Sequence, residues 1–343
     1  MASHGIEIKD LYKIFGPNGE KYIEAVKNGM SKTELNEKHG HVLGLKDINI
    51  SMPAGQIQVV MGLSGSGKST LIRHINRLID PTVGAVVYED ADVCQMSKAE
   101  LLDFRRHKTA MVFQKFALLP HRTVLQNTIY GLEIQGIDKN EAEKRALKWI
   151  ERVGLAGFED NYPNQLSGGM QQRVGLARAL ANDADILLMD EAFSALDPLI
   201  RTDMQAVLLD IQSELKKTVV FITHDLDEAL RLGDRIAILR DGEVIQQGTG
   251  QEIVLNPADA YIADFIKEVN RGRVISVSTI MSGQPIDAVT KVEVGPDDRL
   301  ESAAQAMTDM EENRANVRDI NGNLVGSLDL KDTIRAMVTA ATH

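Results

Sequence analysis

The chain has 343 residues, 43% of them hydrophobic and 25% charged, a composition that excludes a disordered, collagen-like or disulfide-stapled protein. Its 38 basic and 49 acidic residues give a net charge of −11, which argues against a general nucleic-acid binder. The one cysteine, Cys94, excludes an intrachain disulfide and favours a reduced, cytosolic setting. The length predicts two or more domains.

Membrane insertion is not expected from the sequence. The first residues, MASHGIEIKDLYKIFG, lack the apolar core of a signal peptide. No later stretch approaches the roughly 20 apolar residues that a spanning helix needs. We therefore expect any membrane role to run through a partner.

Short apolar runs alternate with helical patterns up to about residue 270, which predicts an α/β domain with a largely parallel sheet. Strands are expected at residues 57–61, 110–113, 186–189, 219–223 and 236–239. Asp241-Gly242 predicts a hairpin turn after the last of these strands.

Residues 17–43 interrupt the first strand region with a polar, helix-prone segment. Ser31 and Glu34 have the spacing of a capping box, so the segment predicts an inserted surface helix. Its two histidines, His39 and His41, are expected to be exposed and solvated, because two histidines without a third ligand rarely form a metal site.

Residues 269–277 predict a linker, and residues 276–343 predict a second module. That module carries 11 acidic and 6 basic residues. Asn321-Gly322 predicts a hairpin turn within it.

The strongest functional signal is the run GLSGSGKST, which fits the pattern G-x-x-x-x-G-K-[ST] between an apolar run and a helical pattern. Such glycines let backbone N–H groups and a helix N-terminus close around phosphates. Lys68 would place its charge on the β- and γ-phosphates, and Ser69 would offer a hydroxyl to Mg²⁺. The expected ATP phosphate-binding residues are Gly62, Ser64, Gly65, Ser66, Gly67, Lys68, Ser69 and Thr70.

A second signal is the apolar run that ends in Asp190 and Glu191. A buried strand with acids at its carboxyl end places them where α/β proteins bind ligands. Asp190 would hold Mg²⁺, directly or through water. Glu191 would act as the general base that activates water.

A third signal is LSGGM, residues 166–170, at the start of a predicted helix. Two glycines and a serine at a helix start form another anion-binding end. One nucleotide does not need two such ends from one chain. The spacing therefore favours two chains that face each other, each completing the other's site.

Taken together, these motifs resemble the ATP-binding subunits of ABC transporters over about residues 6–270. Gly62–Thr70 resemble Walker A, residues 186–190 Walker B, and Ser167, Gly168, Gly169 and Met170 the signature motif that acts in trans. The resemblance implies a P-loop ABC ATPase domain over residues 1–270, with a helical subdomain over about 115–180.

The same resemblance implies roles for single residues outside those motifs. Gln114 resembles the Q-loop glutamine, which touches metal and water, Asp197 lies in a run like the D-loop, and His224 resembles the switch histidine. Phe15, or with less support Tyr12, resembles the aromatic that stacks on adenine. Met170 departs from the glutamine that usually ends the signature, but Ser167, Gly168 and Gly169 carry the anion-binding argument.

Several runs narrow the resemblance to the quaternary amine importers, which take up glycine betaine or proline betaine. These are EAFSALDPLIR, MVFQKFALLPHRTVLQN and the insertion itself. The tail, residues 276–343, resembles one α+β CBS-type module. It could sense a nucleotide or ionic strength, or serve only in dimerisation or as a spacer.

The resemblance implies a homodimeric ATPase with bound ATP and Mg²⁺ at the cytoplasmic face of the inner (plasma) membrane. Its implied partners are two transmembrane permease subunits and a separate substrate-binding protein, with no nucleic acid. An importer of methionine, another amino acid or a polyamine is an alternative. A soluble ABC ATPase of DNA repair is disfavoured, because only 99 positions separate Lys68 from Ser167, without the heptads of a long coiled coil.

Overall fold

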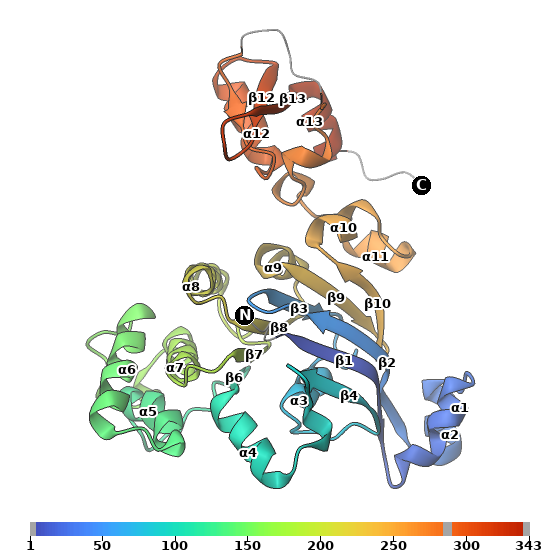
Figure 1. Ribbon diagram of the computed structural model, residues 1–343, viewed down its shortest axis with the longest axis vertical. Coiled ribbons are helices and arrows are strands. Elements are labelled where there is room, and N and C mark those ends of the chain that lie inside the picture. The colour runs from blue at the N-terminus through green and yellow to red at the C-terminus, as the bar shows by residue number, and fades with distance from the viewer. Residues whose placement is uncertain (1–4, 284–289, 339–343) are drawn as a thin grey trace. The chain divides into compact units, whose positions relative to one another are not determined.

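The computed structural model describes residues 5–283 and 290–338. The chain divides into two compact units, Met1–Gln247 and Gly248–His343 (Figure 1). Residues 284–289 and 339–343 of the expected tail module lie outside the described residues.

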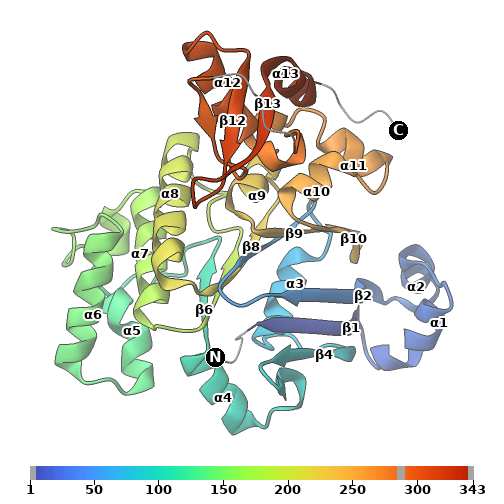
Figure 2. The ribbon, with the colours of Figure 1, turned by 45° about the horizontal axis from the view of Figure 1, so that its top comes forward.

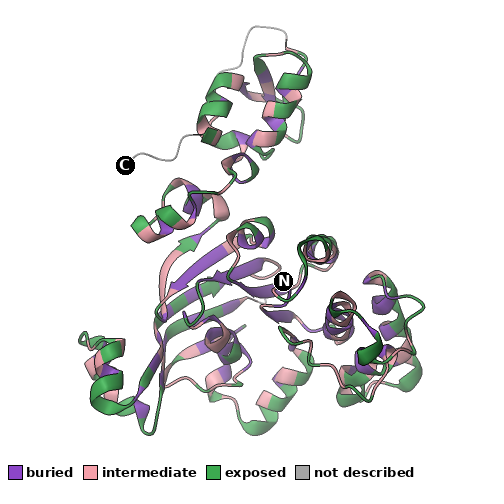
Figure 3. Ribbon diagram, turned by 180° about the vertical axis from the view of Figure 1, so that it is seen from behind, coloured by how far each residue is buried: buried purple, intermediate pink, exposed green. Residues whose placement is uncertain are grey.

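The first unit is centred on a mainly parallel six-stranded sheet in the order β10-β9-β3-β8-β7-β6. Its strands β3, β7 and β8 are buried along their whole lengths (Figure 3), as their continuous apolar sequences predict for central parallel strands. The turn Asp241-Gly242 joins β9 to β10, as expected. The strands are β3 (Ile57–Met61), β6 (Thr109–Phe113), β7 (Ile186–Asp190), β8 (Thr218–Thr223), β9 (Arg235–Arg240) and β10 (Glu243–Gly248).

A second sheet of the same unit has the order β2-β1-β4-β5, and its neighbouring strands are antiparallel. Its strands are β1 (Ile6–Phe15), β2 (Val42–Met52), β4 (Val83–Tyr88) and β5 (Ala91–Asp92). One hydrophobic core joins the two sheets: it combines Ile8 and Leu45 with Leu188 and Ile222, and Ile72 of helix α3 (Lys68–Ile75) completes it.

A helical insertion lies between β1 and β2, as predicted, but it ends at residue 41 because Val42 and Leu43 already belong to β2. It contains α1 (Ile23–Lys27) and α2 (Lys32–His39). Ser31 and Glu34 form the expected capping box. Leu35 anchors α2 in a small core of its own with residues of β1 and β2.

The expectation that His41 is exposed is wrong. His41 is 5% exposed, and its two ring nitrogens bond to the carbonyl oxygens of His39 and Pro17 at 2.7 and 2.8 Å. The imidazole is therefore buried between two backbone carbonyls at the two ends of the insertion and is not solvated.

The remaining helices of this unit lie around the parallel sheet. Helices α5, α6 and α7 lie together on the side away from the antiparallel sheet (Figures 1 and 2). The helices are α4 (Lys98–His107), α5 (Val124–Gln135), α6 (Lys139–Arg152), α7 (Gly168–Ala181), α8 (Pro198–Leu215) and α9 (Leu226–Leu232).

The second unit has its own core, built around a three-stranded sheet in the order β11-β12-β13. Leu255 packs on that core, and the Ser276 backbone N–H donates to Gln251 at 2.9 Å, so residues well before 276 belong to the unit. Its elements are α10 (Gly250–Leu255), α11 (Ala260–Phe265), β11 (Glu293–Val294), α12 (Leu300–Asp309), β12 (Arg314–Arg318), β13 (Leu324–Asp329) and α13 (Leu330–Val338). The predicted architecture is confirmed: an α/β unit with a mainly parallel sheet is followed by a small α+β module.

Candidate functional site

The run Gly62–Thr70 connects β3 to α3 as a loop that requires glycine. Gly62 has φ +151°, and a Cβ on it would strike the carbonyl oxygen of Leu239. Gly67, at φ +102°, would place a Cβ 2.9 Å from the carbonyl oxygen of Gly44. L-residues rarely adopt such φ values, so these two glycines fix the loop's path.

Lys68 lies inside this loop and is 4% exposed. Its Nζ donates to the carbonyl oxygens of Gly62 and Leu63 at 2.8 and 3.0 Å. Burial lowers the pKa of Lys68, and the nearby charges of Glu191 and Asp190 oppose that shift. The ammonium is therefore a buried cation that an anionic ligand would stabilise.

The loop also holds a buried hydroxyl that lacks a hydrogen-bond partner. Ser66 is 5% exposed, and its Oγ has no partner among the described residues. A buried polar atom left unpaired costs free energy, so the loop suits a ligand that brings its own acceptors.

Asp190 ends β7 beside the start of α3. The Ser69 hydroxyl donates to Asp190 Oδ1 at 2.8 Å, and Arg73 Nη2 lies 3.5 Å from Asp190 Oδ2. Sequence reasoning missed Arg73, although it falls one helical turn after Ser69, on the same face of α3.

These residues also fit a magnesium ion. A hydroxyl and a carboxylate are the hard oxygen ligands that Mg²⁺ prefers, and it usually takes its other ligands from phosphates and water. Within residues 5–283 and 290–338, no cluster of three or more His, Cys, Asp or Glu could hold a metal ion. The chain would thus supply only part of a magnesium shell, and the rest would come from a bound nucleotide and water.

Glu191 sits where the ends of several strands meet. Parallel pairing sets Phe113 opposite Asp190 and Asp190 opposite Ile222, which brings the segments after β6, β7 and β8 to one edge. Glu191 adopts φ +47°, and its backbone N–H donates to Ile222 at 3.2 Å.

The Glu191 carboxylate is the common neighbour of three predicted site residues. Oε1 lies 3.7 Å from Lys68 Nζ. Oε2 accepts from Gln114 Nε2 at 3.3 Å and lies 3.6 Å from His224 Nδ1. The Gln114 amide also donates to Ser194 at 3.3 Å, a contact that the sequence did not suggest.

The segment after Gln114 is held by a half-buried arginine of α7. Phe116 and Ala117 have φ of 54° and 48°, and Arg178 donates to their carbonyl oxygens at 3.1 and 2.7 Å. Burial lowers the pKa of Arg178. Sequence reasoning missed this contact because 61 or more positions separate the partners.

A cleft of about 460 Å³ joins the phosphate loop to the outer end of the antiparallel sheet. Phe15 lines this cleft and is 38% exposed, whereas Tyr12 is buried in the core beneath the insertion. The lining residues are Phe15, Lys32, Val42, Leu43, Gly44, Ser64, Gly65, Gly67, Lys68, Ser69, Thr70, Gln114 and Glu191.

The structure does not bring two predicted motifs to this cleft. In the described part of the chain, its lining includes neither Ser167–Met170 nor Asp197. Ser167 instead caps α7, accepting from the Met170 N–H at 3.3 Å, and Asp197 caps α8, accepting from the Ile200 N–H at 3.1 Å.

Comparison with known proteins shows the family of the chain. The family model described as "ABC transporter" matches residues 45–194. The glycine betaine transport ATP-binding protein OpuAA of Bacillus subtilis (strain 168) is 54% identical over 276 residues, which cover 80% of this chain and 66%, just under two thirds, of that protein. The glycine betaine/proline betaine transport system ATP-binding protein ProV of Escherichia coli (strain K12) is 48% identical over 335 residues, 97% of this chain and 82% of that protein.

A solved structure agrees with these relatives. It is a dimeric, post-hydrolysis state of the ATP-binding cassette MJ0796 bound to ADP and Pi, 34% identical, with a TM-score of 0.61 over 71% of this chain and 98% of that one. The chain belongs to the ATP-binding proteins of ABC transporters. Within that family, it is similar over most of its length to those of glycine betaine transport systems.

Proposed function

We propose that this chain is the ATP-hydrolysing subunit of an importer for a quaternary amine such as glycine betaine or proline betaine. The observation that carries the ATPase part is the convergence of Lys68, Gln114 and His224 on the Glu191 carboxylate beside a phosphate loop. The cargo rests on relatives at 54% and 48% identity that are glycine betaine transport ATP-binding proteins.

In this proposal, each residue of the cluster has a separate task. Lys68 exchanges its two carbonyl contacts for phosphate oxygens, which offsets the cost of burying its charge. Glu191 takes a proton from the attacking water. Gln114 and His224 orient that water and the terminal phosphate, since phosphoryl transfer depends on positioning and charge stabilisation. Ser69 and Asp190 would hold Mg²⁺, which would neutralise charge on the phosphates.

In this proposal, the exposed signature segment of each chain completes the nucleotide site of a second copy of the chain. The start of α7 has donors for an anion, yet Ser167 and Gly168 lie exposed and outside the cleft. A homodimer in which each α7 start faces the partner's phosphate loop would complete two sites. The D-loop carboxylate Asp197 would lie in the same interface.

The proposed dimer works with two membrane permease subunits and a substrate-binding protein at the cytoplasmic face of the membrane. Within the described residues, no helix combines the length and apolar character needed to cross a membrane. Transport would therefore depend on partners that do.

Reconstitution tests the function directly. The complex of this chain with its permease and binding protein should hydrolyse ATP faster when glycine betaine or proline betaine is added. Methionine and a polyamine, the alternative cargoes, are added in parallel experiments for comparison. Stimulation by methionine alone would contradict the proposed cargo but not the proposed ATPase activity. A complex without ATPase activity under any solute would contradict the proposal as a whole.

A further inference from the structure

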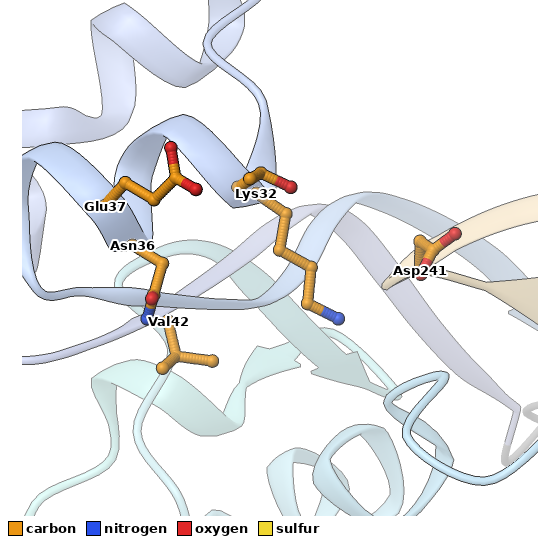
Figure 4. Close-up of a pocket in the computed structure, with 6 residues that line it drawn as sticks. Lys32, Asn36, Glu37, Val42 and Asp241 are labelled. Atoms are coloured by element: carbon orange, nitrogen blue, oxygen red, sulfur yellow. The ribbon is translucent and has the colours of Figure 1, made fainter.

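A second hollow of about 350 Å³ lies beside the nucleotide cleft (Figure 4). It is lined by Lys32, Thr33, Asn36, Glu37, Val42 and Asp241. Lys32 and Val42 line the nucleotide cleft as well, so the two hollows adjoin at these residues. The insertion between β1 and β2 therefore forms part of the wall of the nucleotide cleft.

Two apolar side chains, Phe15 and Val42, line the nucleotide cleft near this second hollow. Phe15 and Val42 are paired across β1 and β2, and they are 38% and 45% exposed. An aromatic ring and a β-branched side chain, side by side and open to water, offer a surface on which a flat base can stack.

Lys32 places a cation at the edge of that surface. Figure 4 shows its side chain leaving the first turn of α2 and ending between Val42 and Asp241. No ion pair or hydrogen bond of its ammonium is found among the described residues. On the same helix, by contrast, Lys38 pairs with Glu34 at 2.7 Å.

The far wall of the hollow is held in place by the phosphate loop. Asp241 lies in the turn between β9 and β10, and the next residue, Gly242, donates its backbone N–H to the Ser66 carbonyl at 3.1 Å. The capping box and Leu35 fix α2 in the same way. Lys32 thus extends from one fixed wall toward the other.

We propose that Lys32 binds the base–ribose end of the nucleotide, so that the inserted helix α2 forms part of the nucleotide site. The proposal rests on the function proposed above and adds a binding residue to it. An ammonium has three donors, and purine ring nitrogens such as N7 accept hydrogen bonds, as do ribose hydroxyls. The phosphates are bound elsewhere, by Lys68 and the loop, so the contribution of Lys32 should follow the base and ribose.

Binding of ADP reports on the whole nucleotide, whereas binding of pyrophosphate reports on its phosphates alone. Neither measurement requires ATP turnover. We would measure their dissociation constants with Mg²⁺ by titration calorimetry on the full chain. Lys32→Ala should raise the dissociation constant of ADP about 5- to 10-fold, as expected for a lost charge-assisted hydrogen bond. It should leave that of pyrophosphate unchanged, and Lys32→Arg should retain most of the ADP affinity.

Lys38→Ala is the matched control, because Lys38 lies on the same helix and its partner Glu34 is within the insertion; its ADP affinity should equal that of the unmodified chain. Unchanged ADP affinity in Lys32→Ala would overturn the proposal. An equal loss for pyrophosphate would do the same, because it would indicate a phosphate contact or a folding defect. If the unmodified chain bound neither ADP nor pyrophosphate, the result would contradict the proposed ATPase function itself.

Discussion

Two helices of the first unit, α3 and α7, begin in turns rich in glycine and serine, but their surroundings differ. The start of α3 is enclosed: Lys68 is buried, and Asp190 and Glu191 lie against it. The start of α7 is open, with Ser167 and Gly168 exposed and no charged residue in its first turn.

The difference shows that an anion-binding helix start is not by itself a catalytic site. Both starts offer backbone N–H groups, but only the start of α3 combines them with a buried cation, Lys68, and two neighbouring carboxylates, Asp190 and Glu191. The α7 start can contribute donors to a charge that another molecule presents. Four experiments test this difference and the burial on which it depends.

The largest effect is expected at Glu191. Glu191→Gln keeps the shape of the side chain and removes its basicity, so ATP turnover should fall at least about 10²-fold while ATP binding persists. Steady-state ATPase rates and ATP dissociation constants would be measured together. Glu141→Gln, on α6 and paired with Arg145, is the control and should change neither. Near-normal hydrolysis by Glu191→Gln would exclude the general-base role.

The burial of α3 also predicts a pH dependence of stability. His74 on α3 is fully buried, and burial lowers its pKa to about 4. The unfolded chain binds the proton more readily, so the free energy of unfolding should fall by about 3 kcal/mol as pH drops from about 6.5 to about 4.

His74→Gln cannot titrate and should flatten that slope in denaturant unfolding followed against pH, whatever its effect on absolute stability. His121→Gln, at an exposed position, should keep the slope. If both variants kept the slope, other groups would be its source.

Mixing two defective chains tests the role of the α7 start. Lys68→Ala and Ser167→Arg should each abolish most ATPase activity. In a mixed dimer, one composite site would carry both lesions and the other none, so an equal mixture should recover about a quarter of the normal activity if one intact site can turn over. Absence of recovery in a sample shown to contain mixed dimers would favour sites built within one chain.

The smallest effect is expected from removing the second unit. All predicted nucleotide-binding residues lie in Met1–Gln247, so a chain ending at Gln247 should bind ADP within about twofold of the full chain. ATPase activity of the reconstituted complex against ionic strength then separates the two roles considered for the tail. The electrostatic screening length falls from about 10 Å at 0.1 M to about 3 Å at 1 M salt. If the tail is a charge-based sensor, the activity curves of the full and the shortened chain should therefore diverge. Superimposable curves would leave a dimerising or spacer role.

Contiguous sequence determined much of this protein. The strands β3, β7 and β8 are predictable because each is a short apolar run between turns, and the capping box at Ser31 because its two members are three residues apart. The phosphate loop can be predicted from the sequence for the same reason. Its glycines, Lys68 and Ser69 are close together in the sequence, so local sterics dictate their arrangement.

Which distant residues share a site depends on how the chain folds. Glu191 meets Lys68, Gln114 and His224 because parallel register brings the ends of β6, β7 and β8 to one edge. Phe15 lines the cleft while Tyr12 is buried, which strand alternation alone could not decide because β1 contains register shifts. The burial of His41 and the place of Lys32 beside the cleft depend on how the insertion folds back onto β1 and β2, and such packing over long sequence separations leaves no periodic pattern in the sequence.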